Sequence, residues 1–233
     1  MTSARGPEAL ALWPVPVFTA VYPDAANDHP EILRAFAAMR RLDAAAPAGG
    51  AFYASPDHLL QRCALAELHR LFEFVAHTLG NALADLNRAA WQAAGIERAR
   101  IEFVGSWFQI CNRGAFHDVH THGNASWSGA YYVDVDPHAR RTAHAVYGAR
   151  NGVLRLYGPR FDALGGAHID AGNAYLLDAH HDVPPEPGLL ILFPSWLKHG
   201  VLPYEGERDR VVISFNAQVT AAGTERLGAF AHA

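Results

Sequence analysis

Apolar residues in the first hundred positions recur mainly at helical spacing. Residues 10–22 form an exception, because they contain prolines within an apolar run. Edge strands tolerate proline, so this run predicts an extended edge strand. A first helix is expected over residues 29–42, with Asp28 as its N-cap. A long helical region is expected over residues 55–93, with Gly80 as the position where it breaks or bends. Its apolar positions are Leu59, Leu60, Cys63, Leu65, Leu68, Leu71, Phe72, Val75, Leu79, Leu83 and Leu86.

From about residue 100 the pattern changes to short apolar segments separated by turn residues. These segments predict strands at residues 101–111, 115–123, 127–135, 152–157, 174–179, 188–194, 199–203 and 210–218. About eight short strands at this spacing are typical of a sandwich or jelly roll. The segment 137–148 interrupts the series and is expected to be a long loop, either a lid or a contact surface.

Both patterns together predict an α+β protein in which residues 1–233 form a single domain. Residues 1–99 are expected to supply an N-terminal strand and a helical support for a β-rich core of residues 100–220. A chain of 233 residues without internal repeats or linkers suits one domain with a substantial core.

The composition limits the classes of partner. A net charge of -4 and a hydrophobic content of 50% give no reason to expect a nucleic-acid or membrane-surface partner. Neither a signal peptide nor a membrane-spanning run is recognised, so a cytoplasmic location is expected. Cys63 and Cys111 do not make a disulfide framework. The sequence is compatible with a homodimer but does not set the oligomeric state.

Three histidines are the candidates for chemistry. His120 and His122 alternate on the strand predicted at residues 115–123, so both side chains point to one face, as does Asp118. His199 comes from a distant strand. Three neutral imidazoles that converge from two strands suit a first-row transition metal. The alternative is a chance set of surface or hydrogen-bonded histidines, because the chain has 14 of them.

Six segments of the β-rich part form an ordered series of motifs. They are Trp107-Phe-Gln-Ile-Cys-Asn-Arg-Gly, His120-Thr-His122, Ser128-Gly-Ala-Tyr-Tyr-Val133, Gly152-Val-Leu-Arg-Leu-Tyr-Gly-Pro-Arg160, Pro187-Gly-Leu-Leu-Ile-Leu-Phe-Pro-Ser-Trp-Leu-Lys-His199 and Arg210-Val-Val-Ile-Ser-Phe-Asn216. The series resembles the Fe(II)- and 2-oxoglutarate-dependent oxygenases, in particular small prolyl-hydroxylase-like proteins of bacteria and phages. That resemblance implies a double-stranded β-helix, a cupin-like jelly roll, with the N-terminal helices packed on one sheet.

The resemblance implies Fe(II) as the metal and 2-oxoglutarate as the cosubstrate. In this superfamily a His-x-Asp/Glu pair and a distal histidine hold the iron and leave three positions open. This chain departs from the superfamily pattern, because His122 occupies the carboxylate position. The bacterial and phage subgroup that it resembles also carries an HxH...H motif. A site of His120, His122 and His199 would be one charge unit more positive, and its metal affinity should depend more strongly on pH. Asp118 is the alternative ligand, or a partner that orients a ligand histidine.

The resemblance also implies that Arg210 binds the distal carboxylate of 2-oxoglutarate. A planar guanidinium pairs well with a carboxylate, and a hairpin after the third histidine would turn Arg210 inward. Many relatives carry a hydroxyl group two residues after this arginine. Here that residue is Val212, and Ser214 is a weak substitute. The alternative for Arg210 is a surface salt bridge with Glu207 or Asp209.

Further pocket residues are expected on neighbouring strands. Tyr132 corresponds to a tyrosine that contacts the same carboxylate in the resembled family, and strand alternation then turns Tyr131 away. Simple packing is the alternative for both tyrosines. His117, Trp107 and Gln109 are candidates for the substrate side of the pocket, or for its core and rim.

Two other polar segments carry weaker hypotheses. His180-His181-Asp182 is expected to be an exposed loop, with contact to a substrate as the alternative. The segment 137–150 holds several side chains that can be cationic, which would favour an acidic partner or form a solvated rim. They are Arg140, Arg141, His144 and Arg150.

The leading functional hypothesis is a 2-oxoglutarate-dependent dioxygenase that hydroxylates an unactivated C–H bond of a peptide side chain or a small metabolite. A cupin-like three-histidine dioxygenase that works without 2-oxoglutarate is the second hypothesis. A non-enzymatic metal-binding or sugar-binding jelly roll is the third. The sequence contains no P-loop, GxGxxG, HExxH or GxSxG motif, which argues against the enzyme classes that these motifs mark.

Overall fold

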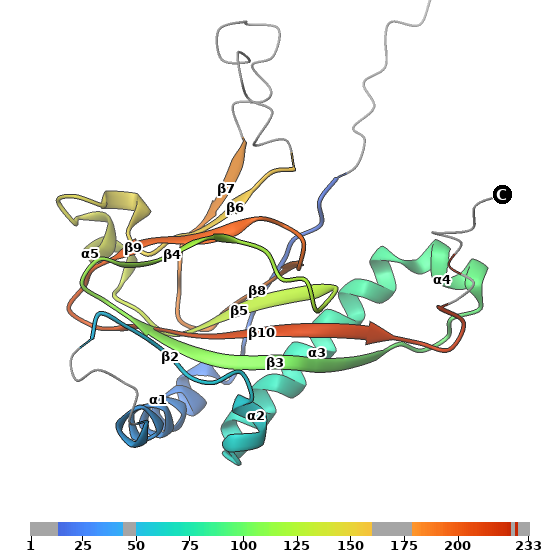
Figure 1. The fold of residues 1–233 in the computed structure, drawn as a ribbon, viewed down its shortest axis with the longest axis horizontal. Helices are drawn as coiled ribbons and strands as arrows, with labels where there is room; N and C mark the ends of the chain where they lie inside the picture. The colour runs from blue at the N-terminus through green and yellow to red at the C-terminus, as the bar shows by residue number, and fades with distance from the viewer. Residues whose placement is uncertain (1–13, 44–49, 160–178, 225–226, 228–233) are drawn as a thin grey trace, which may run out of the picture.

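The computed structural model of the protein describes residues 14–43, 50–159, 179–224 and 227. Two antiparallel sheets face each other, and helices of the N-terminal half lie against the outer face of the larger sheet (Figure 1). This is the predicted α+β architecture, a double-stranded β-helix with N-terminal helices packed on one sheet.

The larger sheet has the order β1-β8-β5-β10-β3-β2, and the smaller sheet has the order β4-β9-β6-β7. The strands of the larger sheet are β1 (Phe18–Val21), β2 (Phe52–Ala54), β3 (Arg100–Cys111), β5 (Trp127–Asp134), β8 (Leu189–Pro194) and β10 (Arg210–Thr220). Those of the smaller sheet are β4 (Ala115–His120), β6 (Leu154–Tyr157), β7 (His180–Val183) and β9 (His199–Tyr204). Of the edge strand predicted over residues 10–22, the part Phe18–Val21 is confirmed as β1, which pairs only with β8 among the described strands. Residues 10–13 lie outside the described residues.

The central strands of the larger sheet are buried on both faces. On β5, Ala130 and Tyr132 face the apolar residues of the smaller sheet, whereas Tyr131 and Val133 face the helices. Strand alternation produces this division, and a sheet covered on both faces reads as a continuous apolar run. The face of β5 that is turned towards the smaller sheet is therefore apolar, and the polar groups between the two sheets lie next to it.

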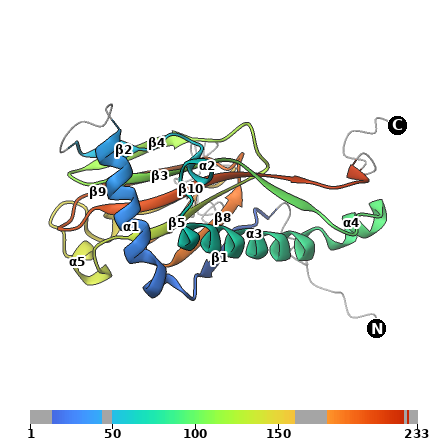
Figure 2. The ribbon, with the colours of Figure 1, turned by 90° about the horizontal axis from the view of Figure 1, so that it is seen from below.

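The helical layer consists of four segments, and Figure 2 shows the two longest lying across the sheet. The segments are α1 (Ala25–Leu42), α2 (Leu59–Arg62), α3 (Ala66–Leu86) and α4 (Arg88–Ala94). The predicted apolar face of α3 is confirmed as buried against the sheet. No helix in the described ranges combines the length and the apolar character needed to cross a bilayer.

The prediction of one helical region from residue 55 is wrong at its start. The Ser55 amide donates to the Phe108 carbonyl at 2.9 Å, and the Ser106 amide donates to the Asp57 carbonyl at 3.0 Å. These bonds hold the chain extended along β3. The helix then breaks at residues 63–65 and again at Asn87, whereas Gly80 lies inside α3.

Asp28 is not an N-cap, because α1 begins three residues earlier, at Ala25. The Asp28 side chain is 2% exposed and accepts hydrogen bonds from Tyr22 Oη at 2.6 Å and Arg70 Nη2 at 2.7 Å. The carboxylate therefore links the start of α1 to β1 and α3, a role that local sequence cannot indicate.

The predicted strands of the β-rich half are confirmed with small shifts of their ends, except for residues 174–179, of which 174–178 lie outside the described residues. The expected loop His180-His181-Asp182 is wrong, because these residues belong to β7 and pair with β6. Asp182 accepts two hydrogen bonds from its cross-strand partner Arg155, at 2.7 and 2.8 Å. The Asp182 carboxylate of this segment therefore forms an ion pair that links β7 to β6.

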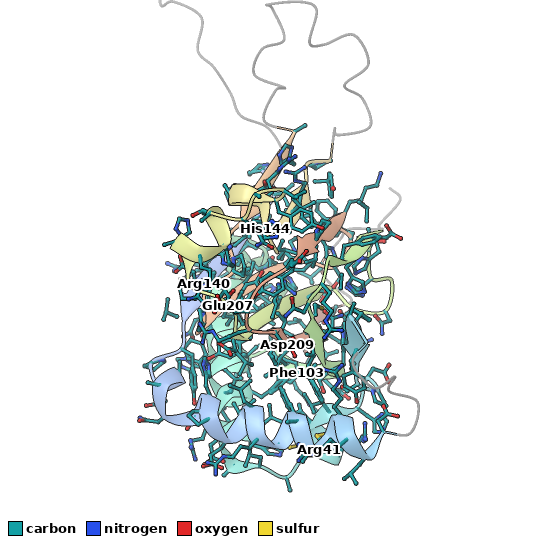
Figure 3. All side chains as sticks on the ribbon, turned by 90° about the vertical axis from the view of Figure 1, so that its left-hand side faces the viewer. Arg41, Phe103, Arg140, His144, Glu207 and Asp209 are labelled. Carbon is teal, nitrogen blue, oxygen red and sulfur yellow. The ribbon has the colours of Figure 1, made fainter. Side chains whose placement is uncertain are left out.

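The expected loop at residues 137–148 contains the short helix α5 (His138–Thr142) and leads into a 3₁₀ turn, η1 (Gly148–Arg150). Arg141 is 1% exposed, and it donates to the carbonyls of Asp136, Asn151 and Pro185. Arg140 forms an ion pair with Glu207 at the surface, where Figure 3 shows them side by side. At least two of the four candidate cations thus stabilise the fold.

Candidate metal centre

The three histidines meet where the two strands β4 and β9 lie side by side. His120 ends β4 and is the cross-strand partner of His199, which begins β9. His122 lies beyond the end of β4, so its predicted place on the same strand is wrong. Its backbone amide instead donates to the Ser195 carbonyl at 2.9 Å. This hydrogen bond holds the His122 backbone where its side chain lies beside those of His120 and His199.

One ring nitrogen from each of His120, His122 and His199 lies within 4.8 Å of the others. The ring centroids are 4.3 Å apart for His120 and His199, 5.0 Å for His120 and His122, and 5.2 Å for His122 and His199. Such a cluster of imidazoles can surround one transition-metal ion.

Backbone carbonyls orient two of the rings. His120 Nδ1 lies 2.7 Å from the Asp118 carbonyl, and His199 Nδ1 lies 2.8 Å from the Leu197 carbonyl. A carbonyl oxygen only accepts hydrogen bonds, so each Nδ1 carries the proton. Each Nε2 then keeps its lone pair for a metal, as ligand histidines require.

The environment keeps two of the imidazoles uncharged. Burial is the main cause that lowers the pKa of His199 to about 3 and the pKa of His122 to about 4. The neighbouring histidines lower both pKa values further, because adjacent positive charges repel. Both rings are neutral at physiological pH and can donate a lone pair to a cation.

Asp118 does not join the cluster. Its side chain is exposed, and the ligand atoms that the described residues bring together come from histidines alone. Asp118 contacts the site through its backbone carbonyl, which holds His120. The expectation that its carboxylate replaces His122 therefore has no support in the geometry.

Arg210 lies in the interior between the sheets, with 1% of its surface exposed. Its Nη2 is 3.5 Å from Tyr132 Oη, and its Cζ lies 5.0 Å from the centre of the Tyr132 ring. Its Nε and Nη1 have no hydrogen-bond partner among the described residues. The alternative of a surface salt bridge is wrong, because Arg210 is buried. Glu207 pairs with Arg140 instead, and Asp209 lies 3.9 Å from Arg40.

Tyr131 points to the opposite face of β5. Its hydroxyl group lies 2.5 Å from His29 Nε2, within the helical layer. Of the two adjacent tyrosines, Tyr132 is thus the one that lies beside Arg210.

A single pocket connects the three histidines to Arg210. It contains about 440 Å³ of space not filled by atoms, part of which is open to solvent. The candidate residues Trp107, Gln109 and His117 line it, as do Val212 and Ser214. The positions two and four residues after Arg210 therefore face the same space.

Four buried residues near the site did not stand out in the sequence. Cys111 is the cross-strand partner of Arg210. Burial raises the pKa of the Cys111 thiol, and the positive charge of Arg210 makes this rise smaller. Ser128, Ser195 and Asn216 form a hydrogen-bonded series behind His122. Only the register of distant strands brings these side chains together, so spacing along the sequence carries no signal for them.

Comparisons with known proteins agree with this geometry. A family model described as "Putative 2OG-Fe(II) oxygenase" matches residues 105–216, which include the three histidines and Arg210.

Solved structures similar to this chain include SnoN, a non-haem α-ketoglutarate-dependent epimerase from nogalamycin biosynthesis. It has a TM-score of 0.52 at 12% identity, covering 94% of this chain and 86% of SnoN. HygX from Streptomyces hygroscopicus, solved with nickel and 2-oxoglutarate, has a TM-score of 0.51 at 12% identity, covering 88% and 82% of the two chains. A Pseudomonas putida prolyl-4-hydroxylase is 18% identical over 87% of this chain and 92% of its own, with a TM-score of 0.44. No protein of curated function matches the sequence.

The fold and the site define a non-haem metal enzyme built on a double-stranded β-helix. Within that class, the match of residues 105–216 to the putative 2OG-Fe(II) oxygenases indicates a 2-oxoglutarate-dependent oxygenase. Its cofactors are Fe(II) and 2-oxoglutarate, and it acts with O₂ on a small-molecule or peptide substrate. This match argues against a three-histidine dioxygenase without 2-oxoglutarate and against a non-enzymatic jelly roll.

The residues present fit both groups. Three imidazole nitrogens converge on one point, and two of the rings are held neutral by burial. At the other end of the pocket, a buried guanidinium has two nitrogens without a partner among the described residues. A buried cation in this state is unfavourable until an anion pairs with it.

Proposed function

We propose that the protein hydroxylates an unactivated C–H bond of a peptide side chain or a small metabolite. His120, His122 and His199 serve as iron ligands, and Arg210 with Tyr132 binds 2-oxoglutarate. The observation that supports this assignment is the pocket that joins three imidazoles to a buried guanidinium. Two nitrogens of this guanidinium have no hydrogen-bond partner among the described residues. When bound, iron and 2-oxoglutarate supply the oxidation: the cosubstrate loses CO₂ to become succinate, and one oxygen atom of O₂ enters the substrate.

In this assignment, Arg210 pairs with the distal carboxylate of 2-oxoglutarate. Its charge is permanent, and its free N–H groups can donate charge-assisted hydrogen bonds to the carboxylate oxygens. Tyr132 stacks against the guanidinium and fixes its orientation. Val212 supplies no hydroxyl group, so Ser214 on the same face is the available substitute.

The three-histidine ligand set changes the charge of the iron site. With three neutral ligands, the site would keep the full charge of Fe(II), which is one unit more than in a site where one of the ligands is a carboxylate. The neutral state of His122 and His199 supports this, because protons do not compete for these rings near pH 7.

The substrate would enter beside Trp107, Gln109 and His117. These side chains line the pocket on the histidine side, and the His117 ring lies 5.0 Å from the His120 ring. They offer an aromatic face, an amide and an imidazole for recognition. Because one structural neighbour is an epimerase, the mass of the product must be measured as well as turnover.

The test of this function is the Arg210→Ala variant with Arg155→Ala as its matched control. Two lost charge-assisted hydrogen bonds at about 1.5 kcal/mol each should weaken 2-oxoglutarate binding at least about 100-fold. Metal binding should stay unchanged. Arg155 pairs with Asp182 in β6 and β7 and is not among the residues lining the pocket, so its variant should resemble the wild type.

The measurement is O₂-dependent formation of succinate from 2-oxoglutarate at increasing cosubstrate concentration. Undiminished succinate formation by Arg210→Ala at low 2-oxoglutarate would remove Arg210 from the anchor. A product heavier than its substrate by one oxygen atom identifies hydroxylation, and a product of equal mass contradicts it.

A further inference from the structure

His122 is oriented differently from the other two histidines. His120 and His199 each direct Nδ1 at a backbone carbonyl two residues earlier. The Nδ1 atom of His122 instead lies 3.5 Å from Nδ2 of Asn216, a side chain on β10. The orientation of this ring therefore depends on a side chain from a distant part of the chain.

Asn216 is the first member of a buried polar series. Its Oδ1 is 2.7 Å from Ser128 Oγ, which lies 2.8 Å from Ser195 Oγ. The exposed fractions are 5% for Asn216 and 1% for each serine, so these groups depend on one another for hydrogen bonds. Ser195 also binds the backbone of His122 through its carbonyl, so the series holds both the main chain and the ring.

The proton positions in this series decide which nitrogen of His122 is free. If Asn216 directs its NH₂ group at Nδ1, the ring proton must be on Nε2, and that nitrogen cannot bind a metal. A half-turn of the amide directs Oδ1 at Nδ1, which then carries the proton. The NH₂ group then donates to Ser128 Oγ, and Ser128 donates to Ser195 Oγ. In both arrangements Asn216 stays hydrogen-bonded to Ser128, and Ser128 stays hydrogen-bonded to Ser195.

We propose that Asn216, supported by Ser128 and Ser195, is a positioning residue that prepares His122 to bind iron. Its Oδ1 accepts the Nδ1 proton of His122 and leaves the Nε2 lone pair for the metal. All three histidines then have the same tautomer, two set by backbone carbonyls and one by an amide. This inference rests on the proposed ligand set, because it assumes that His122 is a ligand.

The hydroxyl groups make this arrangement adaptable. Ser128 can donate to Oδ1 or accept from Nδ2, since a hydroxyl group does both. The amide can therefore turn when a metal arrives and still keep its hydrogen bond to Ser128. A leucine of similar size at position 216 would keep the packing but could accept no proton from His122.

The experiment is a titration of the purified full chain with Co(II) alone, followed by visible absorption. Asn216→Leu should weaken Co(II) binding about 10–100-fold, the usual effect of losing a partner of a ligand histidine. Its absorption bands should also change, because the ring of His122 is no longer held. Asn216→Asp keeps an oxygen acceptor and should restore both the affinity and the bands.

Two further variants keep the result interpretable. Asn151→Leu is the matched control, because Asn151 is also buried but bonds to the main chain of Glu205, away from the histidines. It should bind Co(II) like the wild type. Ser128→Ala removes the support of the amide with a smaller change in volume and should weaken binding in the same direction as Asn216→Leu. Thermal unfolding of each variant shows that it is folded.

The His122→Ala variant separates the proposed ligand set from the proposed positioning role of Asn216. If His122→Ala weakens Co(II) binding and Asn216→Leu does not, the positioning role is wrong and the ligand set stands. If neither variant changes Co(II) affinity, the proposed ligand set is wrong. Equal losses in Asn216→Leu, Asn216→Asp and Asn151→Leu would show a purely structural effect and would also overturn the positioning role.

Discussion

The chemistry of single residues in this protein depends on which buried groups carry charge. His122 and His199 are neutral, and Arg210 is permanently charged. The pocket thus has an end with two neutral histidines, where we propose the metal binds, and an end with one fixed positive charge, where we propose the anion binds. His122 stands where the superfamily pattern that the resemblance implies has a carboxylate.

Replacing His122 with aspartate tests that position. The His122→Asp variant introduces the carboxylate that the superfamily pattern implies at this position and adds a negative charge beside the cation. Its affinity for Mn(II) should equal or exceed that of the wild type, because opposite charges attract. His122→Ala should lose most of the affinity. Isothermal titration with Mn(II) measures both, and a folded His122→Asp protein that binds no Mn(II) would show that position 122 does not reach the metal.

At the scale of elements, the carboxylate of Asp28 links α1 to β1 and α3 through Tyr22 and Arg70. Burial by itself would raise the pKa of Asp28, but the hydrogen bonds from Arg70 and Tyr22 outweigh it and lower the pKa. A carboxyl group with a lowered pKa stabilises the folded state above its unfolded pKa of about 3.9. That contribution is lost as the pH falls through the folded pKa.

The Asp28→Ala variant should therefore be less stable than the wild type at pH 7 by about 1–3 kcal/mol, since the buried Tyr22 hydroxyl group loses its acceptor. The difference should shrink as the pH falls below about 4, where Asp28 becomes protonated in the wild type. Urea unfolding at several pH values measures it. Asp85→Ala is the control, because the ion pair of Asp85 with Arg88 is exposed. A difference that grows towards low pH would contradict this role of Asp28.

Periodicity along the sequence predicts a strand or helix, and its buried face, well where the residues of that one element determine them. Alternation in β5 divides Tyr131 from Tyr132, and helical spacing identifies the buried face of α3. It fails where a distant partner decides, as at residues 55–57, which are held along β3 instead of entering a helix. The series of Asn216, Ser128 and Ser195 depends on strand register in the same way.

At the scale of the whole molecule, the helices and the smaller sheet cover opposite faces of the same central strands. Residues on both faces of β5 are buried, so neither covering layer can leave without exposing that sheet. The β-helix motifs of the sequence identify this core, but nothing in them fixes which face the helices cover. We expect residues 1–233 to behave as one domain for this reason.

The described layers should unfold together. Calorimetry of the metal-free protein should show one transition with equal calorimetric and van't Hoff enthalpies. Mn(II) at about 100 times its dissociation constant adds about 2.7 kcal/mol, which should raise Tm by roughly 5–10 °C. Two separate transitions, of which metal shifts only one, would show that the helical layer and the β-helix are independent units.

The central claim is that Fe(II) and 2-oxoglutarate occupy the pocket between the histidines and Arg210 together. The most direct measurement is an anaerobic titration of the protein with both, followed by visible spectroscopy. A weak metal-to-ligand charge-transfer band should appear only when both are present, and Arg210→Ala should need far more 2-oxoglutarate to produce it. If Fe(II) binds and 2-oxoglutarate produces no band at any concentration, the claim is contradicted.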